Sequence, residues 1–485
     1  MSNNHAASIP VTVDSGSLAV IEPDPNVPLI QTLDSIPENA TATLEKPKDV
    51  IPEVETISAA PRHSPFGALL SRTLPRYTGP YKVGVTDVEL PVPRRTFGTF
   101  KHRRLANAEA GLSMETVFFT LFYPAEPALN ASGKVVWFPK LGQTVDGFLK
   151  MAKRTPNIAY RSVAYPIAAA TITGTTFPAY ESAHMKSPPT GERWPLMLFS
   201  HGVGCSRLMY SSYCGEMASR GYVVAAIEHR DGTGPSSTIR TAQGTTQKLD
   251  WLQWSDLIWP DLAEQPKDDT TLRHEQIALR LAETEEVIKA LQQVSRGEPV
   301  LQTTLTPVNL EFGKWIDASR PIMTGHSLGG SLAIAAAADS RFNFSHVIAT
   351  DPAMQRLEPW TGKISYPLLI ITSEEFVIQE DFIRTVRMSK SAKSASIFTI
   401  AGATHPSFSD IHLILPNLVN RLMGLGCSPG LVVDKTIQTS MAFLTGNVQA
   451  AQKTATLFKG KAKPNQPIGP PGTFYWHRDA QFDFA

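Results

Sequence analysis

The chain has few cysteines, few charges and no long apolar runs, and each shortage excludes a class of protein. Three cysteines among 485 residues cannot build a disulfide framework, and none are paired at zinc-binding C-x-x-C spacing. Lys and Arg number 45 against 44 Asp and Glu, so no net field attracts nucleic acid. Residues 1–20 lack the layout of a signal peptide, and no stretch approaches 18 uninterrupted apolar residues. We therefore expect a cytoplasmic protein without a nucleic-acid partner.

The first 65 residues lack aromatic side chains altogether. They contain no Phe, Trp or Tyr, and they carry 3 basic and 9 acidic residues, a net charge of −6 that leaves +7 on the rest. Frequent prolines interrupt every candidate helix. This composition predicts a disordered acidic arm over residues 1–65, because little apolar surface is present to offset the entropy of ordering. An extended arm that wraps the domain is the alternative.

Short apolar runs alternate with helical patterns through the rest of the chain. The helical pattern is clearest over 273–295, where Ile277, Leu281, Ile288 and Leu291 recur at three- and four-residue steps. This alternation predicts an α/β fold with a mostly parallel central sheet and helices on both faces. We expect one catalytic domain over 66–449, with a Trp-rich lid or pocket wall at 233–269. A C-terminal tail is expected over 450–485, rich in Pro and Gly at 463–473, with aromatic residues near its end that favour docking. The apolar runs are 116–123, 196–199, 222–227, 322–324, 347–350, 368–372 and 397–400.

A G-x-S-x-G sequence lies between a predicted strand and a helix of small residues. Ser327 stands at its centre, and Gly325 and Gly329 allow the sharp turn that exposes a nucleophile at the carboxyl edge of a sheet. The helix that begins at Leu328 would turn its positive end toward a developing oxyanion. The pattern predicts a nucleophilic serine.

A base and an acid follow in the order Ser, Asp, His. Asp351 lies 24 residues after Ser327 and ends a predicted strand, and His405 lies 54 residues further on, after another strand. Carboxyl ends of parallel strands share one sheet edge, so His405 is predicted to take the serine proton and Asp351 to orient His405. The sequence leaves other bases open, namely His326, His346 and His412. It also leaves two other acids open, Asp339 and Asp410.

An earlier strand leads into the sequence His-Gly-Val-Gly. Gly202 and Gly204 permit a loop that turns a backbone N–H toward a substrate carbonyl. We expect the N–H groups of Val203 and Leu328 to form the oxyanion hole.

These residues belong to blocks by which the sequence resembles the platelet-activating factor acetylhydrolase family of α/β-hydrolase-fold esterases. The resemblance implies the same triad, Ser327, Asp351 and His405. It also implies a calcium-independent esterase that removes a short or oxidised sn-2 acyl chain from a glycerophospholipid, with no metal and no cofactor. The blocks are GPYKVGVTD (79–87), PLMLFSHGVG (195–204), ASRGYVVAAIEHRDG (218–232), GHSLGG (325–330), ATD (349–351) and FTIAGATHPSFSD (398–410).

Other interpretations stay open at this point. A general carboxylesterase or polyester-type hydrolase would share the same loops, and a non-catalytic binding module could share the fold. Glu228 and Asp231 are expected to be structural, paired with Arg230 or with backbone. Residues 161–174 are rich in Ala and Thr, so the predicted contact with a membrane surface is weak and transient. The candidate stripe for it is Val145, Phe148, Leu149 and 151–152, and a stripe buried in the core is the alternative. No oligomeric state is predicted.

Overall fold

A computed structural model describes residues 64–103, 110–240, 245–298, 311–377, 379–459 and 466–478. The predicted arm over 1–65 therefore lies outside the described residues, apart from its last two. Within the described part, a 12-stranded sheet has the order β17-β18-β16-β15-β14-β13-β8-β9-β3-β1-β6, and β7 pairs with β3.

The centre of the sheet is parallel, and this confirms the predicted fold class. Near-continuous apolar runs form these strands because both faces of the sheet are covered. On one side, β3 runs antiparallel to β9 and to the long β1. The parallel strands are β8 (Trp194–Ser200), β9 (Val223–Ile227), β13 (Ile316–His326), β14 (Val347–Thr350), β15 (Ile364–Ser373) and β16 (Ala392–Ile400), and the antiparallel pair is β1 (Lys82–Phe97) and β3 (Leu112–Glu126).

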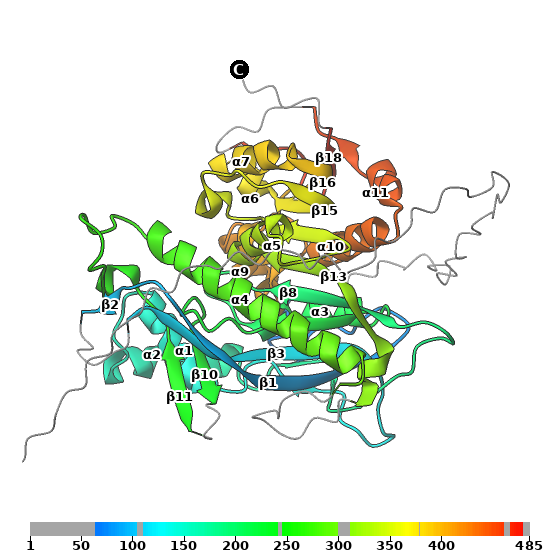
Figure 1. Cartoon of the computed structure of the whole chain (residues 1–485). Helices are drawn as coiled ribbons and strands as arrows, with labels where there is room; N and C mark the ends of the chain where they lie inside the picture. Colours follow the sequence, from blue (N-terminus) through cyan, green and yellow to red (C-terminus); the bar gives the residue numbers. More distant parts are fainter. Residues whose placement is uncertain are drawn as a thin grey trace, which may run out of the picture. The chain divides into compact units, whose positions relative to one another are not determined.

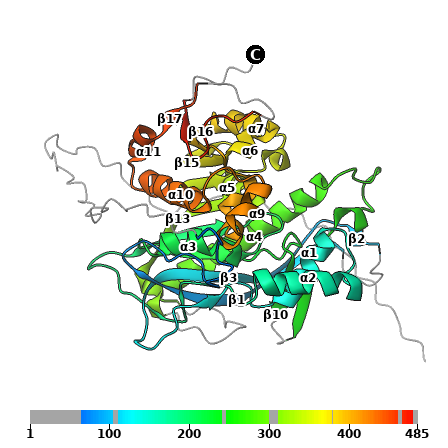
Figure 2. The same cartoon turned by 180° about the vertical axis from the view of Figure 1, so that it is seen from behind.

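Helices cover both faces of the sheet. The long helix α4 (Thr270–Ser295) and the helix α5 (Leu328–Ala338) lie on one face, and α3 (Ser211–Ala218) and α10 (Pro429–Leu444) lie on the other (Figures 1 and 2). Successive strand residues point to opposite faces, so Leu198 joins one apolar core and Phe199 joins the second. The carboxyl ends of the parallel strands meet at one edge of the sheet, between these two layers of helices.

The sheet continues past residue 449, where the catalytic domain was expected to end. After α11 (Val448–Thr454), strand β17 (Thr456–Leu457) pairs with β18 (Phe474–His477), and β18 lies antiparallel to β16. Phe474 stacks on Phe398 with ring centroids 5.0 Å apart. Part of the expected tail is therefore an edge of the central sheet, because its aromatic residues bury against β16.

The segment 233–269 holds a hairpin of β10 (Ser236–Arg240) and β11 (Thr246–Asp250), followed by β12 (Leu257–Ile258). β12 pairs with β2 (Lys101–His102), and Trp259 packs on Phe100 with ring centroids 4.8 Å apart. Trp259 is buried in this small core and is not exposed to a substrate.

Two helices before β8 complete the surface near the site. In α1 (Leu141–Met151), Val145 is buried and Phe148 packs against the core, so these two members of the expected membrane stripe are core residues. In α2 (Ile158–Thr171), Ala168 is the one buried residue. Among the described helices, none has the length and apolar character needed to cross a bilayer. The remaining elements are β4 (Val135–Val136), β5 (Thr176–Phe177), β6 (Tyr180–Glu181), β7 (His184–Met185), α6 (Glu374–Val377), α7 (Glu380–Ser389), α8 (Ile411–Ile414) and α9 (Asn417–Leu422).

Candidate active site

Ser327 occupies the turn between β13 and α5. Its backbone has φ 57° and ψ −122°, a strained conformation for a residue other than glycine. A Cβ atom at Gly329 would lie 2.1 Å from the carbonyl oxygen of Ser200, and one at Gly325 would lie 2.2 Å from that of Gly329. Both positions therefore require glycine, and the turn presents Ser327 at the carboxyl edge of the sheet.

Asp351 directly follows β14, the next strand. Its carboxylate is fully buried and accepts hydrogen bonds from the Ser373 backbone N–H at 2.8 Å and the Ser373 hydroxyl at 2.6 Å. Oδ2 of Asp351 also lies 3.0 Å from Nδ1 of His405. The two hydrogen bonds from Ser373 hold the carboxylate in place, and its Oδ2 atom faces the imidazole of His405.

His405 follows β16 and begins a short 3₁₀ turn (His405–Phe408). Its side chain is 36% exposed, and its backbone N–H donates to Glu375 at 2.8 Å. Burial lowers the pKa of His405, but the hydrogen bond and charge of Asp351, with smaller contributions from Glu375 and Asp381, outweigh it and raise the pKa above the usual value. An imidazole oriented in this way can accept a proton and become a stabilised cation.

The fold brings these three predicted residues to one edge. The Ser327 N–H donates to the carbonyl of Thr350 at 3.0 Å, which ties the serine to the residue before Asp351. The rings of His326 and His405 lie 4.6 Å apart. Among the described residues no hydrogen bond joins the Ser327 hydroxyl to His405, and such bonds commonly tighten only when substrate is bound.

The other candidate bases have different partners. His326 lies within the cluster, but its Nδ1 bonds the hydroxyl of Tyr210 at 2.7 Å. Nδ1 of His412 bonds Asn420 at 2.7 Å, and His346 packs on Phe443.

The other candidate acids are also engaged elsewhere. Asp339 is ion-paired with Arg341 at 2.6 Å. Asp410 is buried and accepts hydrogen bonds from Trp137 Nε1 at 3.1 Å and the Ser211 hydroxyl at 2.6 Å. Asp351 is thus the candidate whose carboxylate faces His405.

The loop after β8 lies against the serine. A Cβ atom at Gly202 would stand 2.9 Å from Cβ of Ser327. The Gly202 N–H donates to the Tyr210 hydroxyl at 3.3 Å, and the Gly204 N–H donates to the Thr233 carbonyl at 2.8 Å.

Two backbone groups beside Ser327 remain unused. Within the described part of the chain, the N–H groups of Val203 and Leu328 have no hydrogen-bond acceptor. These are the two donors predicted for the oxyanion hole, and both are available to an incoming carbonyl oxygen.

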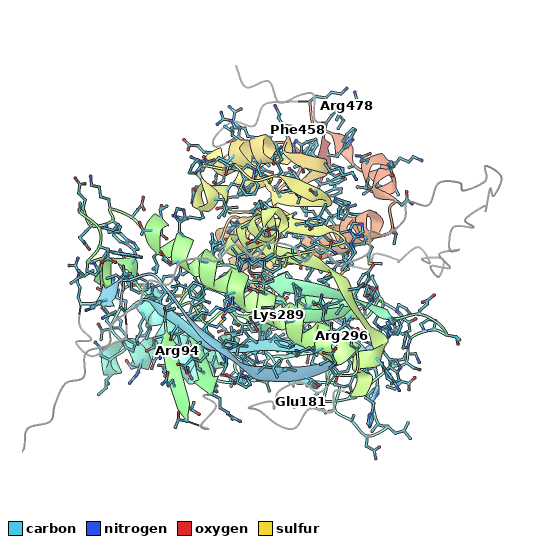
Figure 3. All side chains as sticks on the ribbon, in the orientation of Figure 1. Arg94, Glu181, Lys289, Arg296, Phe458 and Arg478 are labelled. Atoms are coloured by element: carbon cyan, nitrogen blue, oxygen red, sulfur yellow. The ribbon has the colours of Figure 1, made fainter. Side chains whose placement is uncertain are left out.

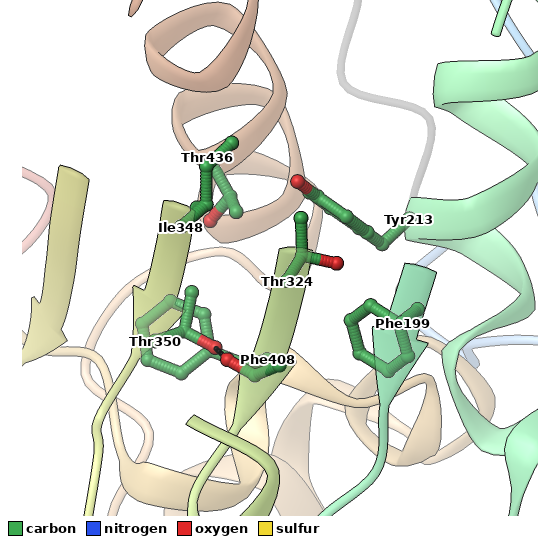
Figure 4. Close-up of a pocket in the computed structure, with 8 residues that line it drawn as sticks. Phe199, Tyr213, Thr324, Ile348, Thr350, Phe408 and Thr436 are labelled. Atoms are coloured by element: carbon green, nitrogen blue, oxygen red, sulfur yellow. Dashed lines mark hydrogen bonds between the residues drawn. The ribbon is translucent and has the colours of Figure 1, made fainter. Parts of the chain in front are cut away.

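Two cavities bear on the substrate, and of these two the smaller one contacts the turn at Ser327. The smaller, behind the turn, is lined by residues including Phe199, Tyr213 and Phe408 (Figure 4) and has a volume of about 10 Å³, roughly one water molecule. An acyl chain does not fit there. The larger has a volume of about 290 Å³ and lies between the start of α1, the β10–β11 hairpin and the segment Ser206–Leu208.

Three potential metal ligands also meet at this edge. Ligand atoms of His326, Asp351 and His405 lie within 4.8 Å of one another. Asp351 and His405 already hydrogen-bond each other, so an ion bound by all three would compete with the contact that orients the base.

Glu228 and Asp231 each accept a backbone N–H, as expected, from Arg207 at 3.0 Å and from Thr233 at 2.9 Å. Their ionic partners were not foreseen, and Arg280 is one of them. Asp231 pairs with Arg280 at 2.7 Å, and Glu228 pairs with Arg207 at 3.4 Å; neither pairs with Arg230. Arg280 was detectable in principle, because it lies three residues after Ile277 and therefore on the apolar face of the predicted helix.

Comparisons with known proteins agree with this architecture. A family profile described as "Platelet-activating factor acetylhydrolase, isoform II" matches residues 67–462. Platelet-activating factor acetylhydrolase of Gallus gallus is 26% identical over 399 residues, 78% of this chain and 84% of the relative. The Bos taurus protein of the same name is 27% identical over 378 residues, 76% of each chain. A ferulic acid esterase from Streptomyces cinnamoneus shares the fold, with a TM-score of 0.50 and 17% identity over 78% of this chain and 93% of that one.

Proposed function

The chain belongs to the platelet-activating factor acetylhydrolase, isoform II, family, and from this premise we propose that it removes short or oxidised sn-2 acyl chains from glycerophospholipids. The chain is a carboxylic ester hydrolase and acts on lipid esters. The observation that carries the assignment of roles is the convergence of Ser327, Asp351 and His405 at one sheet edge, beside two unused N–H groups.

Acylation follows from this geometry. The Ser327 oxygen attacks the sn-2 carbonyl carbon while its proton passes to Nε2 of His405, whose Nδ1–H faces Asp351. The carbonyl electron pair moves to oxygen, and the oxyanion accepts hydrogen bonds from the N–H groups of Val203 and Leu328. Collapse expels the glycerol oxygen, which takes the proton from His405 and leaves as the lysophospholipid.

Deacylation repeats these steps with water. His405 takes a proton from water, the resulting hydroxide attacks the acyl carbon, and Ser327 leaves with the proton returned by His405. The products are a free carboxylic acid and the original enzyme. With the ester and water as the two reactants, atoms and protons balance over the two steps.

The larger cavity favours a substrate with a polar head. Burying an alkyl chain against its ionic lining would desolvate those groups, whereas a zwitterionic head group can replace their water contacts. The chain from Gly202 to Ser206 spans at most about 14 Å, which keeps this cavity within reach of an ester held at Ser327. The charged lining residues are three acids, Asp87, Glu89 and Glu228, and three bases, Lys140, Arg207 and Arg240.

A general carboxylesterase remains the second candidate, and comparative hydrolysis distinguishes the two. We expect an sn-2 acetyl phosphatidylcholine to give a higher kcat/KM than p-nitrophenyl acetate, which has the same acyl group and no head group. Equal or lower kcat/KM for the phospholipid would reject the phospholipid assignment and favour the general esterase. A non-catalytic binding module predicts no turnover of either ester.

Labelling by a fluorophosphonate tests the nucleophile itself. The wild-type chain should be labelled at Ser327, and Ser327→Ala should abolish both labelling and hydrolysis. Asp339→Asn, on the surface and away from His405, serves as the control that keeps both. Labelling that persists at another serine in Ser327→Ala would reject this nucleophile.

We place the transient membrane contact on α2 rather than at residues 145–152. Side chains of Ile158, Val163 and Ile167 on this helix are exposed by more than half, and so are those of Leu418 and Leu422 on α9. Exposed apolar side chains on a helix favour binding at a lipid interface. Ile158→Ser with Val163→Ser should weaken sedimentation with phosphatidylcholine vesicles and leave p-nitrophenyl acetate hydrolysis unchanged.

A further inference from the structure

A buried arginine on α4 touches the loop beside the nucleophile. Arg280 and its partner Asp231 are both 0% exposed, and their ion pair is 2.7 Å long. Lys289 on the same helix and Arg296 just after its end, both labelled in Figure 3, instead have side chains that are about half exposed. A fully buried ion pair is costly unless its hydrogen bonds are complete, so its placement calls for an explanation beyond stability.

Arg280 holds both ends of the oxyanion loop, residues 201–205. One terminal nitrogen donates to the carbonyl of His201 at 2.7 Å, at the start of the loop. The other donates to the hydroxyl of Thr233 at 2.6 Å, and the carbonyl of Thr233 accepts the N–H of Gly204 at 2.8 Å. A single planar guanidinium thus fixes positions on either side of Val203.

The peptide between Gly202 and Val203 is oriented from its carbonyl side. Nδ1–H of His201 donates to the Gly202 carbonyl at 2.9 Å, and Nε2 of His201 accepts the N–H of His229 at 3.1 Å. In a planar trans peptide the N–H points opposite to the C=O, so this bond directs the Val203 N–H away from His201. Burial, with the charge of Arg280, lowers the pKa of His201 to about 4, which keeps the imidazole neutral and in this role at neutral pH.

We infer that Arg280, held by Asp231, is a positioning residue for the Val203 oxyanion donor. This inference rests on the proposed function, because it assigns Arg280 a part in the same ester hydrolysis. Arg280 touches no reacting atom. It acts by fixing the loop, and the fork of its guanidinium is what a lysine cannot reproduce.

The test separates positioning from simple stability. Arg280→Lys keeps a positive charge for Asp231 but cannot reach both His201 and Thr233. We expect kcat/KM for p-nitrophenyl acetate to fall about 100-fold, with KM changed less than threefold, because a displaced donor weakens transition-state binding. The inhibition constant of a trifluoromethyl ketone, whose adduct with Ser327 carries an oxyanion, should rise by the same factor.

A matched control is Arg220→Lys. Arg220 forms a buried ion pair with Glu216 on α3 and bonds Thr78 and Ser219, none of which belong to the oxyanion loop. Arg220→Lys should lower the melting temperature, as Arg280→Lys does, but it should leave the inhibition constant of the ketone unchanged.

A second variant covers the case in which Arg280→Lys does not fold. Thr233→Val removes the hydroxyl that Arg280 reaches and keeps the carbonyl that holds Gly204. It should lower kcat/KM and ketone affinity together by about tenfold. The inference fails if either variant folds and leaves ketone affinity as in wild type, or loses kcat without losing ketone affinity. A wild-type chain that neither hydrolyses the ester nor binds the ketone would overturn the proposed function, and the role of Arg280 with it.

Discussion

The two sides of Ser327 are held by different means. On the oxyanion side, the loop 201–205 is fixed by groups buried as completely as any in the protein, including Arg280 and His201. On the other side, His405 sits on a short turn with its ring partly exposed, held by Asp351. The difference follows the chemistry. A backbone N–H donor stabilises an oxyanion best when it is held rigidly and shielded from water. A general base such as His405 must exchange protons, so it needs contact with substrate and water.

The largest effect should come from breaking the His405 side. Asp351→Asn removes the charge that stabilises the imidazolium and leaves the wrong tautomer, so kcat should fall about 10⁴-fold. Because Asp351 raises the pKa of His405, the acid limb of the pH–kcat/KM profile should also move to lower pH in the variant. In wild type, activity is lost as pH falls through that raised pKa, since a protonated His405 cannot accept the Ser327 proton.

Steady-state rates from pH 5 to 9 check both parts. Asp339→Asn is the control, because Asp339 is an acid paired with Arg341 at the surface. A loss smaller than tenfold in Asp351→Asn, or an acid limb that stays in place, would mean that another group orients His405.

On the oxyanion side, a single added methyl group should lower kcat, but by less than the loss of Asp351 does. A methyl group in Gly202→Ala would lie 2.9 Å from Cβ of Ser327, so the loop must move away from the serine. We expect kcat to fall about 100-fold and the fold to survive, since the displaced group is a loop. Gly142→Ala, where the atoms nearest to the added one belong to the Tyr165 side chain and begin at 3.3 Å, should keep wild-type rates. Unchanged kcat in Gly202→Ala would mean that the spacing between loop and serine is not critical.

The sequence predicted the His405 side better than the oxyanion side. Ser327, Asp351 and His405 each follow a strand, and parallel strands bring their carboxyl ends together whatever the intervening chain does. Arg280 was missed because the role of a charged residue on the apolar face of a helix cannot be assigned until its ionic partner is known. Asp231 lies 49 residues away, and only the tertiary structure joins the two.

The limits of the fold prediction have a similar cause. The parallel strands were visible as apolar runs, but β18 is only four residues long and directly follows the Pro- and Gly-rich stretch 463–473, which predicts irregular chain. Its place in the sheet depends on pairing with β16, a contact across more than 70 residues that local sequence does not encode. The core position of Val145 was likewise decided by the elements packed against α1.

The smallest effect should appear in stability, on the segment that carries His405. Asp410 anchors this segment to α3, and burial, only partly offset by hydrogen bonds from Ser211, Ser212 and Trp137, raises its pKa to about 6. A carboxyl group whose pKa is raised in the folded state contributes stability at low pH that is lost as pH rises through the folded pKa. With an unfolded pKa of about 3.9, this loss is about 1 kcal/mol between pH 5 and pH 7.

Asp410→Asn tests this, because an asparagine cannot titrate. Its deficit in the free energy of unfolding against wild type, measured in urea, should shrink by about that amount from pH 5 to pH 7. The pKa of Asp146 is lowered, mainly by its hydrogen bond from Arg161, so the deficit of Asp146→Asn should stay constant between pH 5 and pH 7 and shrink only as pH falls below the unfolded pKa of about 3.9. A deficit of Asp410→Asn that stays constant from pH 5 to pH 7 would show that the pKa of Asp410 is not raised in the folded state. The contact between the His405 segment and α3 would then not depend on the protonation of Asp410.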